Sequence, residues 1–142
     1  MSIKTTIIYL ILSFFLFTAV FHKANGCFII PKVHVQFDNR LPTNIPKPLV
    51  VHCRTEEDEL GNHTLTPGQS WGFSFCQKPF ITKAICELHW NGLYRNHIVA
   101  YNAQWVSVPC AKECIWVVTE KGATLPYGDF HYWENLPKPP PS

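Results

Sequence analysis

The stretch KAICELHW, residues 83–90, decides the fold class of this chain. Four of its apolar residues share one parity along the chain: Ala84, Cys86, Leu88 and Trp90. The residues between them are mostly polar and include Glu87 and His89. Alternation of this kind is typical of a half-buried β-strand, and no stretch of the chain shows a sustained helical stripe. The sequence therefore predicts a fold built from strands.

Other short apolar or aromatic runs surround this one, and Asn, Gly, Pro and Asp separate them. They cover residues 33–37, 49–53, 71–75, 93–101, 105–108 and 114–118. Asn91-Gly92 is a hairpin-type turn between two of the runs. This pattern predicts an all-β fold, a small antiparallel β-sandwich of about seven to eight strands.

The first 26 residues have the composition of a secretion leader. Lys4 supplies a positive charge, residues 7–17 form an apolar run, and residues 24–26 offer small residues at a cleavage site. The run is shorter than the roughly 20 apolar residues that a membrane span needs. We expect residues 1–26 to be a signal peptide and the mature protein to be extracellular, with no membrane insertion after cleavage. An uncleaved signal anchor is the alternative.

The mature chain is then one domain of balanced charge. Without Lys4 and Lys23, the 12 basic residues fall to 10, which equals the 10 acidic residues. A balanced chain gives no electrostatic reason to bind nucleic acid or an anionic membrane. We place a sandwich domain at residues 27–126 and an irregular, Pro-rich tail at residues 127–142.

All six cysteines lie after the leader, where an oxidising compartment permits disulfides. Cys86 and Cys114 share the parity of their apolar neighbours, so both are expected to point inward. A bridge there could join the two sheets or neighbouring strands, and the count alone leaves the connectivity open. Cys110 and Cys114 lie close enough for a zinc half-site, but no second half-site exists. We therefore expect a disulfide-stapled domain and no metal or other cofactor.

The polar segment Thr55–Gln69 is expected to be a loop that carries two features. The first is the sequon Asn62-His63-Thr64, which makes Asn62 a candidate glycosylation site. The second is the acidic cluster, residues 56–59. A calcium site needs oxygens that converge, whereas four consecutive acids splay apart. A solvated loop is the favoured interpretation of the cluster.

Enzyme motifs are absent from the sequence. It contains no G-x-S-x-G, no H-E-x-x-H and no Gly-rich phosphate loop. Glu87 and His89 lie on one strand face and could form an acid–base pair, but two solvent-facing residues of a half-buried strand are favoured. The chain is predicted not to be an enzyme.

The tryptophans at positions 71, 90, 105 and 116 fall in predicted strands, and most of them are expected in the core. Trp133 lies outside any regular pattern. Packing over the end of the sandwich is the favoured role for Trp133. An exposed patch with Tyr132, as in a defence or carbohydrate-binding module, is the alternative.

The order of several motifs resembles the plant self-incompatibility S1 family over residues 48–125. The motifs are LVVHCR at 49–54, acids ending in Leu60-Gly61, Phe73-Ser74-Phe75, Thr82 with Cys86 and Trp90, then Cys110, Cys114 and Trp116, and finally Lys121-Gly122. Self-incompatibility ribonucleases instead need an H-G-L-W-P motif, which residues 88–93 do not match.

This resemblance implies a secreted, non-catalytic β-sandwich that acts as a recognition ligand for a cell-surface receptor. The four usual cysteines of the family map to Cys53, Cys86, Cys110 and Cys114. Cys27 and Cys76 depart from the family, and we expect them to form an extra bridge. Loops on a rigid scaffold commonly carry recognition, so we expect a monomer that contacts its receptor through residues 55–69, 77–81 and 91–96. The candidate contact residues are Glu56, Glu57, Asp58, Glu59, Lys78, Asn91 and Arg95.

Overall fold

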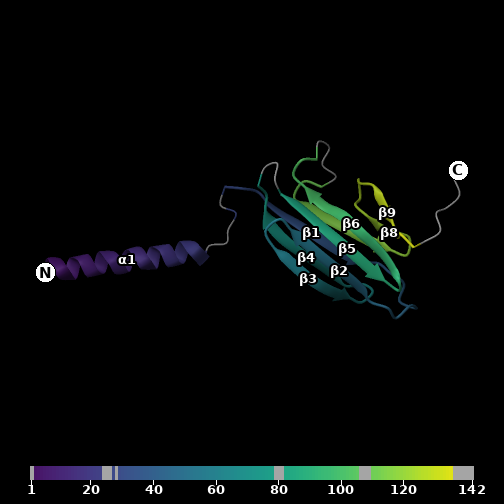
Figure 1. Ribbon diagram of the computed structural model, residues 1–142, viewed down its shortest axis with the longest axis horizontal. Helices are drawn as coiled ribbons and strands as arrows, with labels where there is room; N and C mark the ends of the chain where they lie inside the picture. Colours follow the sequence, from purple (N-terminus) through teal and green to yellow (C-terminus); the bar gives the residue numbers. More distant parts are fainter. Residues whose placement is uncertain (1, 24–26, 28, 79–81, 106–109, 136–142) are drawn as a thin grey trace.

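The computed structural model describes residues 2–23, 27, 29–78, 82–105 and 110–135. The chain begins with one helix, α1 (Ile3–Lys23), which is followed by a sandwich of two sheets (Figure 1). The side chains of residues 2–17 of this segment are all exposed. Within the described part of the chain, no helix combines the length and apolar character needed to cross a bilayer.

Nine strands form the sandwich within the described ranges. They are β1 (Lys32–Asn39), β2 (Leu49–Thr55), β3 (Glu59–Leu65), β4 (Ser70–Cys76), β5 (Lys83–Trp90), β6 (Leu93–Asn102), β7 (Glu113–Thr119), β8 (Gly122–Thr124) and β9 (Phe130–Tyr132). One sheet, sheet A, has the order β4-β1-β7-β8-β9, and the other, sheet B, has the order β3-β2-β5-β6. The predicted all-β fold is confirmed. Trp105 lies outside the strands, and the rest of the predicted run at 105–108 falls outside the described residues.

The structure differs from a purely antiparallel sandwich at one place. β1 pairs antiparallel with β4 but parallel with β7, with Phe37 opposite Trp116. Parallel neighbours need a long connection between them, and β1 and β7 lie far apart in the sequence. Every other strand pair in the two sheets is antiparallel.

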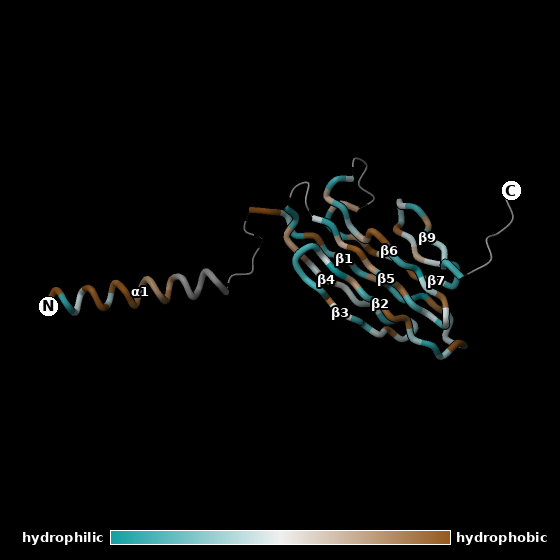
Figure 2. The backbone as a smooth tube through the Cα atoms, in the orientation of Figure 1, coloured by the Kyte–Doolittle hydropathy of each residue, from teal (hydrophilic) through white to brown (hydrophobic). Residues whose placement is uncertain are grey.

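The core lies between the sheets and follows the predicted alternation, which is visible along the strands in Figure 2. In β5, every second residue from Ala84 to Trp90 is buried. Trp116 is 2% exposed, and its indole N–H donates to the Ala100 carbonyl across the core at 3.1 Å. Because the polar atom of this tryptophan is satisfied, its large ring system can pack without a desolvation cost.

Three disulfides hold the sandwich. Cys53 and Cys86 are directly opposite each other in β2 and β5, and both are fully buried. This bridge therefore joins neighbouring strands within sheet B and not the two sheets. Cys110 bonds to Cys114 at the start of β7. Cys27 bonds to Cys76 at the end of β4, the pair assigned to the extra bridge, and so ties the N-terminal segment to sheet A.

Two segments expected to be irregular contain strands. β3 lies inside the polar segment 55–69 and is an edge strand of sheet B, so the expected loop shrinks to short turns at its two ends. β9 lies beyond Tyr127, in the segment expected to be a tail, and pairs with β8 at the edge of sheet A. Trp133 follows β9 and is 2% exposed, next to Trp90. Its packing over the end of the sandwich is as predicted.

Candidate recognition surface

A tight acidic turn joins β2 to β3. The Thr55 hydroxyl oxygen accepts hydrogen bonds from the backbone N–H groups of Glu57 and Asp58, at 3.3 and 2.9 Å. The Thr55 N–H donates in return to the Asp58 carbonyl at 2.8 Å. All four acidic side chains of the cluster, residues 56–59, are exposed. The turn therefore presents carboxylates outward from a backbone that its own hydrogen bonds fix.

Lys78 lies against this turn. Its ammonium group forms an ion pair with the Glu57 carboxylate, and both side chains are at least half exposed. An exposed pair of this kind contributes only about 0–1 kcal/mol to stability. The main effect of this ion pair is to hold Lys78 beside the acidic turn. The structure thus brings together two of the predicted contact segments, 55–58 and 77–78; residues 79–81 lie outside the described residues.

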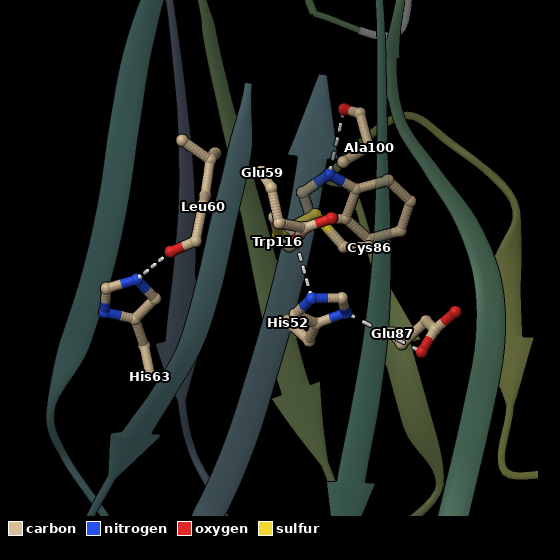
Figure 3. Close-up of a disulfide and its surroundings, with 9 residues drawn as sticks. His52, Glu59, Leu60, His63, Cys86, Glu87, Ala100 and Trp116 are labelled. Carbon is tan, nitrogen blue, oxygen red and sulfur yellow. Dashed lines mark hydrogen bonds and ion pairs between the residues drawn. A yellow bond between two sulfur atoms is a disulfide. The ribbon is translucent and has the colours of Figure 1, made fainter. Parts of the chain in front are cut away.

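Further carboxylates lie on the outer face of sheet B, where His52 lies between two of them (Figure 3). His52 Nε2 is 2.6 Å from Glu59 Oε1, and Nδ1 is 3.8 Å from Glu87 Oε2. The three residues come from three adjacent strands, β2, β3 and β5. Alternation along β5 pairs Glu87 with His89, whereas the strand register places His52 beside Glu87. We refer to the acidic turn with Lys78 and this cluster as the acidic surface.

Asn62 lies on β3, directly opposite His52 in the strand register, and is exposed. The sequon is therefore on an edge strand and not in a loop. His63, the middle residue of the sequon, turns to the other side, where its ring stacks on Trp71 at a centroid distance of 3.8 Å. A glycan on Asn62 would consequently project from the outer face of sheet B, beside His52.

The remaining predicted contact residues lie elsewhere. Asn91 is exposed in the β5–β6 turn, at the opposite end of β5 from the acidic turn, roughly 20 Å away at the usual rise of a strand. Arg95 is only 30% exposed; its guanidinium reaches Glu134 at 3.6 Å and His131 at 3.5 Å. Arg95 thus joins β6 to the segment around β9. The expected third contact segment, 91–96, is separate from the acidic surface.

A Ser–His–Asp relay and a metal site are both absent from the described residues. In sheet A, His34 Nδ1 lies 2.9 Å from the Ser74 hydroxyl, but its Nε2 meets Gln36 at 3.4 Å and no carboxylate. Asp38 instead accepts from Gln36 and Ser70. A Ser–His–Asp relay needs the carboxylate on the imidazole, so this polar row cannot work as one. No group of His, Cys, Asp and Glu among these residues could hold a metal ion.

Sequence reasoning missed one concave feature. A cleft lies between β6 and the β8–β9 hairpin, and His131 contributes to its wall. Burial lowers the pKa of His131 below its ordinary value of 6.5; the nearby Arg95 cation lowers it further, and Asp129 opposes both. The only signal in the sequence was the density of aromatic residues from Tyr127 to Trp133.

We predict that His131 makes the free energy of unfolding depend on pH. As the pH falls from about 7.5 through 6.5, the unfolded chain takes up a proton at this position before the folded chain does, so the free energy of unfolding falls. Below the folded-state pKa both forms are protonated, and the loss stops. Urea unfolding of wild type and His131→Gln across this range should give the flatter profile for the variant. If the difference in free energy of unfolding between the two proteins does not change with pH, the lowered pKa of His131 is contradicted.

Together, the fold and these contacts define a disulfide-bonded β-sandwich that displays charge on one end and one sheet face. The family model described as plant self-incompatibility protein S1 matches residues 34–136. The chain belongs to this family. The match includes β9 and Trp133, and five of the six cysteines; Cys27 lies outside it.

Individual relatives agree with this assignment. S-protein homolog 2 of Arabidopsis thaliana is 34% identical over 82 residues, 53% of this chain and 50% of the relative. Self-incompatibility protein S1 of Papaver rhoeas is 30% identical over 114 residues, 79% of this chain and 76% of the relative. S-protein homolog 11 of Arabidopsis thaliana is 32% identical over 121 residues, 77% and 82% of the two chains. The chain thus spans half the length of S-protein homolog 2. No solved structure matches the chain.

Proposed function

We propose that this protein is a secreted, non-catalytic ligand that a cell-surface receptor recognises through the acidic surface. The observation that carries the proposal is the acidic turn, which holds exposed carboxylates on a hydrogen-bonded backbone at the end of a disulfide-bonded scaffold. A fixed loop loses little conformational entropy on binding, so its charges can serve recognition efficiently. Membership of a family with a self-incompatibility name fits a recognition role.

Secretion is part of the proposal. The leader-like composition of residues 1–26 and the use of every cysteine in a disulfide both fit an oxidising destination. In plant cells that express the full chain, we expect the protein in the extracellular fluid with Cys27 as its first residue. N-terminal sequencing of the recovered protein checks this. Retention in the membrane fraction with residues 1–26 intact would instead establish the signal-anchor alternative.

We also propose that Asn62 carries an N-linked glycan in the secreted protein. Its exposure on an edge strand leaves room for one. Treatment with an N-glycosidase should lower the mass of the wild-type protein and leave the mass of Asn62→Gln unchanged. A glycan there would cover the face around His52, so the receptor contact would centre on the acidic turn and Lys78.

Charge reversal tests the contact surface. An acidic contact implies a basic receptor surface. The variant Glu56→Lys/Asp58→Lys should therefore weaken binding to the receptor-bearing cell surface about tenfold, because the introduced lysines would repel that surface. The hydrogen bonds of the turn use the Thr55 hydroxyl and backbone atoms, so the reversal leaves them in place. The measurement is equilibrium binding of the labelled protein to intact cells.

Glu120→Lys is the matched control for this pair. Glu120 is exposed in the turn after β7, at the opposite end of the sandwich from the acidic turn. We expect binding of this control to match the wild type. The control changes the net charge by half as much as the double variant, so a free-energy loss about half as large in the control would mean that net charge governs binding, and the acidic turn would lose its assigned role.

The alternative of a carbohydrate-binding module was based on Trp133 and Tyr132. Trp133 is buried, and its indole N–H donates to the Thr119 carbonyl at 3.1 Å, so it cannot form an exposed patch. Tyr132 remains 54% exposed beside Phe130. The prediction of an exposed carbohydrate-binding patch made by Trp133 and Tyr132 is therefore wrong, because Trp133 is buried.

A further inference from the structure

The cleft beside β9 has the size and lining of a small-molecule site. Its volume is about 370 Å³, within the range of about 300–1,000 Å³ that is usual for such sites. It lies on the edge of the sandwich formed by β6 and the β8–β9 hairpin. Its lining includes Val99, Trp105, Trp116, Tyr127, Asp129 and His131. None of these residues belongs to the acidic surface, so a ligand in this cleft would bind independently of the proposed receptor contact.

Hydrogen bonds fix the wall formed by the hairpin. At one end, the Glu134 N–H donates to the Tyr94 carbonyl at 2.9 Å, and Arg95 lies between Glu134 and His131. At the other, the Gly128 N–H donates to the Leu125 carbonyl at 3.2 Å and closes a turn with Pro126 at its second position. The cleft lies between this turn and β6. Its shape is therefore largely formed before any ligand binds.

Aromatic rings supply the apolar part of the lining. Trp116 is almost fully buried, and its N–H is used on Ala100, so it offers only ring carbons to the cleft. Trp105 is half-buried and packs against Tyr101 at a ring distance of 5.9 Å. Tyr127 is 91% exposed at the rim. The exposed Tyr127 and the half-buried Trp105 therefore provide the aromatic surfaces on which a ring-shaped ligand can stack, while Trp116 forms the floor behind them.

Two side chains supply directional polar groups. Asp129 offers carboxylate oxygens, which accept hydrogen bonds. Burial keeps His131 neutral near neutral pH. Arginine can only donate, so its approach at 3.5 Å assigns His131 Nδ1 as the acceptor and leaves the proton on Nε2. The cleft therefore combines a strong acceptor, an N–H donor and flat apolar surfaces.

We propose that this cleft binds a neutral saccharide unit. The C–H face of a sugar ring would stack on the aromatic residues, while neighbouring hydroxyls donate to Asp129 and accept from His131. A flat aromatic ligand would bury these two polar groups without partners, which is costly. A cationic ligand could pair with Asp129, but a positively charged group cannot accept the hydrogen bond that the His131 N–H offers. A neutral ring with several hydroxyls fits all of these groups.

Titration of the secreted, disulfide-bonded protein tests the proposal. The probes are neutral disaccharides of glucose, galactose, mannose and xylose, with choline as a cationic comparison, each up to about 10 mM, tenfold above a Kd of about 1 mM. Indole N–H signals in NMR spectra report binding, and a Trp105→Phe variant identifies the Trp105 signal. We expect at least one disaccharide to shift the signals of Trp105 and Trp116.

Matched variants locate the site. Asp129→Asn and Tyr127→Ala should each weaken binding about tenfold, because each removes one contact. Tyr132→Ala is the control: Tyr132 is also exposed, but it packs on Phe130 and does not line the cleft. Unchanged dispersion of the other signals checks that each variant is folded. The proposal is overturned if no disaccharide shifts these signals, if only choline does, or if Tyr132→Ala weakens binding as much as Tyr127→Ala.

Discussion

Replacing the buried disulfide, as in Cys53→Ala/Cys86→Ala, should lower the free energy of unfolding by about 4 kcal/mol. The bridge closes a loop of 33 residues between adjacent, fully buried positions of β2 and β5. In the chain-entropy description, losing it restores freedom to the unfolded chain, and the missing sulfur atoms leave space in the core. Urea unfolding under non-reducing conditions measures the change.

The other two bridges provide the comparison. Cys110–Cys114 spans only four residues, and the same description gives about 2 kcal/mol for it. Cys27–Cys76 spans 49 residues, but its removal also frees the N-terminal segment in the folded state, which offsets part of the loss. We therefore expect Cys53–Cys86 to contribute most. A larger loss from Cys110→Ala/Cys114→Ala would contradict this ranking.

Gly122→Ala should destabilise the sandwich by on the order of 3 kcal/mol and release β9 from β8. Gly122 has a φ of 144°, and a Cβ there would lie 2.1 Å from the backbone carbonyl oxygen of His131. The new methyl group cannot be accommodated by a side-chain rotation, because it meets the main chain of the paired strand. Hydrogen exchange at residues 130–132, together with urea unfolding, should report both effects.

Gly68→Ala is the control for this substitution. Gly68 also has a positive φ, 87°, but nothing lies within 4 Å of a Cβ built on it. It should therefore show only the backbone strain, about 1–2 kcal/mol, with normal exchange protection in β9. If Gly122→Ala shows the same small loss of stability and the same exchange protection in β9 as this control, the close packing of β9 on β8 is contradicted.

Local alternation was enough to predict the central strands, because residues such as Val33, Val35 and Phe37 must face one common core. It failed for β3, which is an edge strand with a mostly exposed face, so its polar residues resembled those of a loop. It also failed for β9, since three residues are too few to establish a period. The parallel pairing of β1 with β7 joins distant parts of the chain and leaves no local signal.

The candidate surfaces also contain some features that the local sequence predicts and others that depend on strand pairing. The acidic turn was visible as consecutive acids, and its exposure follows from their solvation. The contact of His52 with Glu59 and Glu87 depends on the register of three strands, which alternation within one strand cannot give. Arg95 appeared to be a contact residue because it follows a turn, yet the segment after β9 partly covers it. Features made by pairing of strands therefore required the structure.

Saturable binding to intact plant cells tests the central claim most directly. The labelled, secreted protein is incubated with cells from several tissues before and after mild protease treatment of their surface. The ligand role predicts binding in at least one tissue that saturates, that unlabelled protein displaces, and that protease treatment abolishes. Binding that never saturates in any tissue, or that survives removal of surface proteins, would contradict recognition by a receptor.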